Sequence, residues 1–288
     1  MKYSRPVADL IKDRFSCRTY LEEPISAAIR TRLMEAAAAM HSGPLGMPVH
    51  FKLVAATTGD STELKGLGTY GFIRGAAGFL IGTSHTQGLA LENYGYALEQ
   101  LVLLATDLGL GSCWLGGSFR RGSFSRRMTP QKGESIPAVV AVGVIADPDK
   151  ARGSGLRARI GGGRRLGWEV LFFDGQFGAP LSSDAAGPWA EPLEMVRLGP
   201  SASNKQPWRI VRQGSAWHFY LRRTQGYRSG LATRLLGVAD IQHVDIGIAM
   251  CHFELAARAQ GLAGAWEAQP PAMELPDSLA EYVITWKE

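Results

Sequence analysis

The sequence predicts two related α/β halves in one chain, packed against each other as an intramolecular pseudo-dimer. The first observation is an internal repeat: GYALEQLVLLATDLGLGSCW (95–114) aligns without a gap with GIAMCHFELAARAQGLAGAW (247–266). The matched pairs are Gly95 and Gly247, Ala97 and Ala249, Ala105 and Ala257, Gly109 and Gly261, Leu110 and Leu262, and Trp114 and Trp266. The second observation is that the same order of elements surrounds both segments.

The two matched segments are the expected long helices. Both carry apolar residues at helical spacing, and both end on a glycine, the usual stop of a helix. A Gly-rich turn follows each helix, and then comes a strand, AVVAVGVIA (138–146) in the first half and EYVITW (281–286) in the second.

A shorter helix, a loop and a strand precede each long helix. In the first half the helix is ISAAIRTRLMEAAAAM (25–40), and a Pro-containing loop with a strand follows it over 41–57. Its expected buried stripe consists of Ile25, Ile29, Leu33 and Met34. In the second half the helix spans 188–199 and opens at Pro188, where a missing N–H costs nothing, and GPSASNKQPWRIV (199–211) follows it. Ser42 thus corresponds to Ser201 and Pro48 to Pro207.

The repeat divides the chain into a first half, 1–160, and a second half, 161–288. The boundary is expected within ARGSGLRARIGGGRR (151–165), where glycine and arginine interrupt any periodicity. The two long helices should bury their apolar faces against each other, as they would in a dimer.

Composition excludes several classes of protein. The 288 residues are 45% hydrophobic and 20% charged, which is typical of a globular chain. No apolar run reaches the roughly 20 residues of a membrane span, and the N-terminus has no apolar signal core, so we expect a soluble, cytoplasmic protein. Cys17, Cys113 and Cys251 have no CxxC spacing and are expected to be buried, and the six histidines form no metal-ligand cluster.

The formal charge of +5 is concentrated in SFRRGSFSRR (118–127) and RARIGGGRR (157–165). The first patch has only phenylalanines as interleaved aromatics and no recognition module, so nucleic-acid binding is not expected. We interpret 118–127 as a solvated surface loop.

The halves differ in ways that point to one shared site. RFSCR (14–18) has two guanidinium groups and a hydroxyl suited to a phosphate, whereas its counterpart RLGWEVL (165–171) keeps one arginine. Conversely, SASNKQPW (201–208) is polar, and its counterpart SGPLGMPV (42–49) is nearly apolar. Each residue alone has an ordinary alternative, a solvated helix end for the arginines or a turn for the asparagine. The complementary loss favours one composite site across the interface.

These segments resemble the nitroreductase family of flavoenzymes. RFSCRTY is similar to the family's R-x-S-x-R-x-[FY] motif, GPSASNKQPWRIV to its P-S-x-x-N-x-Q-P-W loop, and GLGSCWLGG (109–117) to its Gly-rich turn. GTYGFIRGAAGFLIG (68–82) and DIGIAMCHFELAA (245–257) resemble the form in which one chain carries both halves of the usual homodimer.

The resemblance implies an α+β fold with FMN bound between the halves. By position, Arg14, Ser16 and Arg18, together with Arg164 or Arg165, would hold the phosphate and ribityl end. Trp114 and Leu115 would shape the turn in which Gly116 and Gly117 offer backbone groups to the flavin ring. The second half would add Pro200, Ser201, Ser203 and Asn204, with Gln206 anchoring the loop. Phe15 departs from the family pattern, which often has a polar residue there, and WEAQP (266–270) replaces the glycine turn in the second half. We therefore expect one FMN per chain.

The resemblance further implies a reductase in which NADH or NADPH reduces the flavin and a small acceptor, such as a nitroaromatic or quinone, reoxidises it. No catalytic side chain is nominated. The glycines beginning at Gly109 lie at a helix end, so a Rossmann NAD site is not expected. Two alternatives stay open: a flavin binder that senses, stores or consumes FMN without turnover, and a remnant that binds another phosphate ligand or none.

Overall fold

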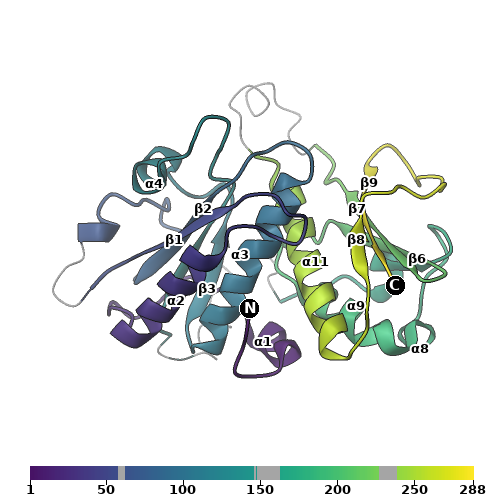
Figure 1. The fold of residues 1–288 in the computed structure, drawn as a ribbon, viewed down its shortest axis with the longest axis horizontal. Coiled ribbons are helices and arrows are strands. Elements are labelled where there is room, and N and C mark those ends of the chain that lie inside the picture. Colours follow the sequence, from purple (N-terminus) through teal and green to yellow (C-terminus); the bar gives the residue numbers. More distant parts are fainter. Residues whose placement is uncertain (58–61, 146, 148–162, 227–238) are drawn as a thin grey trace.

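Two antiparallel-type sheets flank a central pair of long helices in the computed structural model, which describes residues 1–57, 62–145, 147, 163–226 and 239–288 (Figure 1). The first sheet contains four antiparallel strands in the order β1-β2-β4-β3. These strands are β1 (His50–Ala55), β2 (Gly78–Thr83), β3 (Gly111–Leu115) and β4 (Val139–Gly143). The two central strands, β2 and β4, are buried along their whole length, which fits a sheet covered on both faces.

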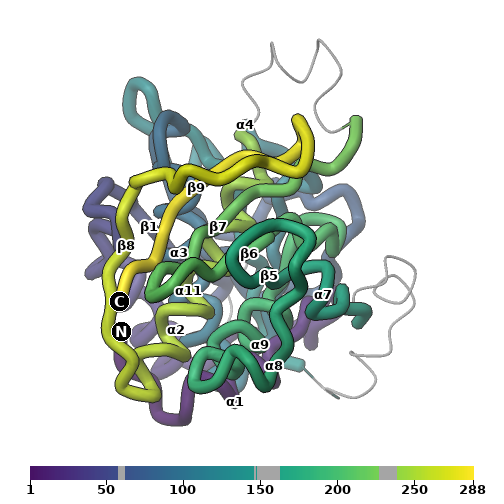
Figure 2. Tube along the Cα trace, turned by 90° about the vertical axis from the view of Figure 1, so that its right-hand side faces the viewer, coloured from purple at the N-terminus to yellow at the C-terminus, as the bar shows by residue number. Residues whose placement is uncertain are grey.

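The second sheet, which faces the viewer in Figure 2, has five strands in the order β5-β6-β7-β9-β8. They are β5 (Phe172–Asp174), β6 (Trp208–Gln213), β7 (Ala216–Arg222), β8 (Ala265–Glu267) and β9 (Ala280–Lys287). Only β5 pairs in parallel, at the edge beside β6. Without β5, the order β6-β7-β9-β8 repeats the order β1-β2-β4-β3 of the first sheet.

The central helices α3 (Ala90–Asp107) and α11 (Ile241–Ala259) cross at two glycines. A Cβ added to Gly95 would lie 2.2 Å from the carbonyl oxygen of Val244, and one added to Gly247 would lie 2.0 Å from that of Glu92. Each glycine therefore faces the carbonyl three residues before the other glycine, so the crossing has approximate two-fold symmetry. Only glycine permits so close a backbone approach.

Charged groups also join the halves beside this crossing. His243 of α11 places Nδ1 2.5 Å from Oε1 of Glu92 in α3 and Nε2 3.1 Å from Oε1 of Glu281 in β9. Burial alone would lower the pKa of His243, but hydrogen bonds to Glu281 and Glu92 outweigh it and raise that pKa to about 10. The imidazole is therefore a cation held between two carboxylates at neutral pH.

The remaining helices cover the sheets and the ends of the central pair. They are α1 (Val7–Asp13), α2 (Ala27–Ala39), α4 (Arg121–Met128), α7 (Trp168–Leu171), α8 (Ser183–Ala186), α9 (Ala190–Leu198) and the single turns η1 (Thr62–Leu64), η2 (Gly187–Trp189) and η3 (Ala202–Asn204). Ser26 caps α2 by accepting a hydrogen bond from the N–H of Ile29.

On helix α2 Leu33 is buried as predicted, but the prediction for Met34 was wrong, because its side chain is 48% exposed.

Two sequence interpretations are corrected by the structure. The segment 118–127 is no surface loop: most of it forms α4, because Phe124 is fully buried and packs edge-on against Phe79 and Phe119. Strand β3 also begins at Gly111, two residues after Gly109, and β8 begins at Ala265, four residues after Gly261, where only a turn was expected.

Other expectations have simpler outcomes. The three cysteines are free and buried, as predicted. The expected boundary, 151–165, lies outside the described residues except for its last three positions. Among the helices that the structure describes, none combines the length and the apolar character that crossing a membrane requires.

Candidate functional site

A cavity of about 470 Å³ lies between the two halves. The first half contributes Arg14, Phe15, Ser16, Arg18, Tyr70, Phe72, Cys113, Trp114, Leu115, Gly116, Gly117, Ser118 and Ala138. The second half contributes Arg165, Pro200, Ser201, Ala202, Ser203, Asn204, Ile241, Val244, Asp245 and Ile248. Cationic side chains and apolar walls thus enclose the same space.

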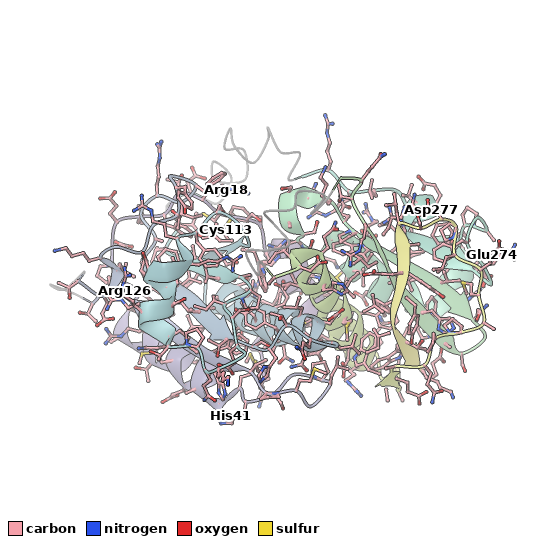
Figure 3. All side chains as sticks on the ribbon, turned by 90° about the horizontal axis from the view of Figure 1, so that it is seen from above. Arg18, His41, Cys113, Arg126, Glu274 and Asp277 are labelled. Carbon is pink, nitrogen blue, oxygen red and sulfur yellow. The ribbon has the colours of Figure 1, made fainter. Side chains whose placement is uncertain are left out.

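Arg14 and Arg18 supply positive charge from the first half. Nη1 of Arg18 is buried and has no hydrogen-bond partner among the described residues, which favours a ligand that brings acceptor oxygens. Arg18 and Cys113 lie together on the same side of the molecule in Figure 3, and both line the cavity. Burial raises the pKa of the Cys113 thiol to about 11, so the thiol adds no negative charge.

The segment that carries these arginines is pinned to strand β3. Ser16 forms an isolated parallel bridge with Ser112, and the N–H of Cys17 donates to the carbonyl of Ser112 at 2.9 Å. Residues 14–18 therefore run beside the strand that leads to the glycine turn. The two sequence motifs of the first half meet because of this pairing.

The glycine turn is held open by α4. Arg121 donates from Nη2 to the carbonyl of Gly116 at 3.0 Å and from Nη1 to the carbonyl of Ile136 at 2.5 Å. A Cβ on Gly116 would meet Ile241 of α11 at 2.4 Å, whereas one on Gly117 would meet nothing within 4 Å. The first glycine is thus required by packing, and the second borders open space.

The second-half loop is strained and tightly held. Ser203, Asn204 and Gln206 have φ values of 50°, 55° and 48°, a left-handed conformation that is costly for residues other than glycine. Oδ1 of Asn204 accepts a hydrogen bond from Arg165 at 3.3 Å. Asp245 accepts one from the N–H of Ala202 through both carboxyl oxygens, at 3.0 and 3.1 Å.

Gln206 lies beneath this loop and ties it together. Its N–H donates to Oγ of Ser201 at 2.8 Å, and its Oε1 accepts from the N–H of Leu166 at 2.9 Å. The carbonyl of Arg164 accepts from the amide of Asn204 at 3.0 Å. Gln206 and Arg164 therefore support the loop without lining the cavity, and all the other predicted site residues line it.

A buried polar network connects the cavity with the second half. Glu99 of α3 is inaccessible to solvent and lies 3.7 Å from Nε of Arg14. Its other contacts are Nε1 of Trp114 at 2.7 Å and Nε2 of His252, from α11, at 3.0 Å. Glu99 therefore lies within ion-pair distance of Arg14 and joins it to a hydrogen-bonded network that includes α11.

One stripe of α11 forms a wall of the cavity. Ile241, Val244 and Ile248 are apolar, and Asp245 is their only polar companion on that stripe. Burial raises the pKa of Asp245 well above its ordinary value, which the hydrogen bond from Ala202 only partly opposes. Sequence reasoning missed Asp245, although the ungapped repeat pairs it with Asn93 and could have indicated a residue that differs between the halves.

Two aromatic residues near the cavity were also missed. Tyr70 is 62% exposed with a φ of 49°, and Phe72 is 44% exposed. The guanidinium of Arg120 lies 5.7 Å from the centre of the Tyr70 ring. Their signal was the aromatic pair within GTYGFIRG, since aromatic rings can stack on a planar ligand.

A family model and a solved structure that match this chain are both described as nitroreductases. A family model described as "Putative TM nitroreductase" matches residues 6–257. The crystal structure of a "putative nitroreductase" from Thermotoga maritima has a TM-score of 0.61 at 17% identity and covers 100% of this chain and 95% of its own, which shows a common fold.

Two further structures match about half of the chain. A "putative nitroreductase in complex with FMN" from Exiguobacterium sibiricum has a TM-score of 0.40 at 14% identity, covering 51% of this chain and 91% of its own. A second, also with FMN, from Desulfovibrio desulfuricans has a TM-score of 0.38 at 24% identity, covering 50% and 89%. No curated protein matches the sequence.

Proposed function

Because the chain belongs to this nitroreductase family, we propose that it is an FMN-dependent oxidoreductase that uses NADH or NADPH to reduce nitroaromatic, quinone or similar small acceptors in a ping-pong sequence. The observation that carries the proposal is the cavity between the halves, where Arg14, Arg18 and Arg165 converge beside a glycine turn. The FMN of the neighbouring structures named above agrees with that chemistry.

We also propose that residues 1–160 and 161–288 are two nitroreductase-like halves fused as a pseudo-dimer. The repeated strand order and the symmetric crossing at Gly95 and Gly247 support this division. One chain would then supply both sides of a site that a homodimer builds from two subunits.

The residues present fit the flavin. Arg14, Arg18 and Ser16 would hold the phosphate and ribityl end, because guanidinium groups and a hydroxyl suit phosphate oxygens and Nη1 of Arg18 lacks a partner among the described residues. Arg165 reaches the same cavity from the second half. The turn at Gly116 and Gly117 would lie beside the ring system, opposite the loop from Pro200 to Asn204.

The protein's own contribution is binding, orientation and exclusion of water. Bound flavin would supply the redox chemistry, accepting electrons from the nicotinamide and passing them to the acceptor. The apolar stripe Ile241, Val244 and Ile248 would shield one side of the site, and Tyr70 and Phe72 would offer stacking surfaces to a planar donor or acceptor. No side chain is proposed to react covalently.

A single flavin per chain is the proposed stoichiometry. When the register of the repeat is continued upstream, Leu89 and Tyr96 are the counterparts of Ile241 and Ile248, two residues that line the cavity. Leu89 and Tyr96 instead pack with Leu45 into the second-half core. The position related by the pseudo-two-fold axis is thus occupied by apolar side chains.

The test is the colour of the purified protein and its response to reductant. Flavin absorbance that NAD(P)H bleaches under anaerobic conditions, and that a quinone restores, is the expected result. Flavin that neither nicotinamide reduces would instead indicate a binder without turnover. Protein that takes up no added FMN would refute the assignment altogether.

A further inference from the structure

Asp245 is a carboxyl group in an otherwise apolar stripe of the cavity wall. Its neighbours along that stripe of α11 are Ile241, Val244 and Ile248. Only 3% of the residue is exposed. An ionised carboxylate in such a position needs a paired cation or several hydrogen-bond donors.

The structure gives Asp245 one donor and no cation. Both carboxyl oxygens share the N–H of Ala202, and no ion pair of Asp245 occurs among the described residues. On its own helix the nearby titratable groups are Asp240 and His243, and α3 adds Glu92, to which His243 is already paired. The cations facing it across the cavity are Arg14, Arg18 and Arg165.

The repeat shows that capping the loop does not require an acid. Asn93 stands at the matching position of α3 and caps the matching loop: its Oδ1 accepts from the N–H of Leu45 at 3.1 Å, as Asp245 accepts from Ala202. Asn93, however, also donates from Nδ2 to the carbonyl of Met47 at 2.9 Å. The hydrogen bonds of Asp245 among the described residues are those from the N–H of Ala202, and its side chain lines the cavity, so a proton on its carboxyl group would be within reach of a ligand there.

We propose that Asp245 is a neutral carboxylic acid that positions the cavity's ligand by donating a hydrogen bond to an acceptor atom of a heteroaromatic ring. The inference rests on the proposed flavin site and adds a residue to it. A ring carbonyl oxygen or a ring nitrogen could accept the hydrogen bond from the O–H of Asp245, and the flavin ring has both kinds of acceptor. Ionisation of Asp245 would remove the donor and place a negative charge against those acceptors.

Ligand affinity is then coupled to protonation. The ligand binds the protonated form, so affinity is greatest below the pKa of Asp245 and falls as pH rises through it, by up to about tenfold per pH unit. Burial raises this pKa, which extends the pH range of the acid form upward from that of an exposed aspartate.

The first experiment needs no ligand. Infrared difference spectra of the flavin-free wild type and Asp245→Asn at neutral pH should show the carbonyl stretch of a protonated carboxylic acid in the wild type alone. Asp184→Asn, which removes an exposed carboxyl group from α8, should leave that band in place. A wild-type spectrum without the band at neutral pH would overturn the inference, whether or not flavin binds.

The second experiment measures flavin affinity by fluorescence quenching from about pH 6 to about pH 9. Riboflavin serves as a probe beside FMN, because the phosphate of FMN itself titrates near pH 6. Wild type and Asp184→Asn should lose affinity as pH rises. Asp245→Asn should bind within about threefold of wild type at low pH, since its amide keeps an N–H donor and the cap, and should show no such loss.

The outcomes separate this inference from the proposed function. Flavin that binds with the same pH profile in Asp245→Asn and wild type would overturn the role of Asp245 and leave the flavoprotein assignment intact. Failure of the wild type to bind FMN at any pH would refute the flavoprotein assignment together with the ligand contact of Asp245.

Discussion

Gly95 and Gly247 stand at the crossing of α3 and α11, each in contact with the backbone of the opposite helix at the carbonyl three residues before its partner. The contact lets the backbones of α3 and α11 approach more closely than any side chain at these positions would allow. A side chain at either position would have to separate the helices.

Gly247→Ala should therefore destabilise the protein strongly. The added Cβ would lie 2.0 Å from the carbonyl oxygen of Glu92, a rigid backbone atom. We expect the free energy of unfolding, measured by urea denaturation, to fall by about 1–3 kcal/mol. Gly122→Ala is the control: nothing lies within 4 Å of its Cβ in α4, so it should be neutral or stabilising by up to about 1 kcal/mol.

Arg18→Ala should weaken FMN binding about 10- to 100-fold without loss of thermal stability. Its Nη1 is buried and has no partner among the described residues, so the folded protein loses little while the phosphate loses a charged donor. Titration of fluorescence quenching checks this. Arg126 belongs to α4, is labelled away from Arg18 in Figure 3 and does not line the cavity. Arg126→Ala should therefore bind as wild type does, and equal affinity in both variants would contradict the phosphate assignment.

The Glu99 network should be far more sensitive than an exposed ion pair. Glu99→Ala leaves Arg14 and His252 buried beside an empty site and should cost about 3–5 kcal/mol in the free energy of unfolding. Glu63→Ala removes the half-exposed partner of Arg127 and should cost less than about 1 kcal/mol. Similar losses from both changes, compared by thermal denaturation, would show that Glu99 has no special role.

The raised pKa of His243 should make the free energy of unfolding depend on pH. Its pKa is raised to about 10 in the folded protein, so its contribution is complete below about pH 6.5 and is lost as pH rises through about 10. The free energy of unfolding should fall over this range by up to about 1.4 kcal/mol per pH unit. His243→Gln should flatten the curve, whereas the exposed His85, changed in the same way, should leave it unaltered.

Much of the fold was predictable because glycine and apolar spacing mark the long helices. The ungapped match of 95–114 with 247–266 identifies both elements that form the centre of the molecule. What the repeat could not indicate was β3, since its strand-forming residues follow Gly109 at once, where a turn was the simpler reading. Basic composition likewise hid α4, in which Phe124 is the buried side chain.

The residues of the candidate site also fall into two groups, those that the sequence motifs predicted and those that they did not. Motif residues such as Arg18 and Ser203 could be named in advance because their chemistry is visible in the sequence. Asp245 and Tyr70 had only weak signals, a difference between matched positions and an aromatic pair, because each reaches the cavity through tertiary packing of a helix or a loop. The chemistry of Asp245 depends on burial, which its sequence neighbours do not reveal.

The two central helices belong to one polypeptide, and this has a consequence for how the protein can change. A subunit of a homodimer carries every substitution twice, so a residue that improves one side of an interface also alters the other. Here a change in α11 leaves α3 untouched. Asn93 and Asp245 illustrate this freedom: two matched positions perform the same capping task, and only one of them carries an acid.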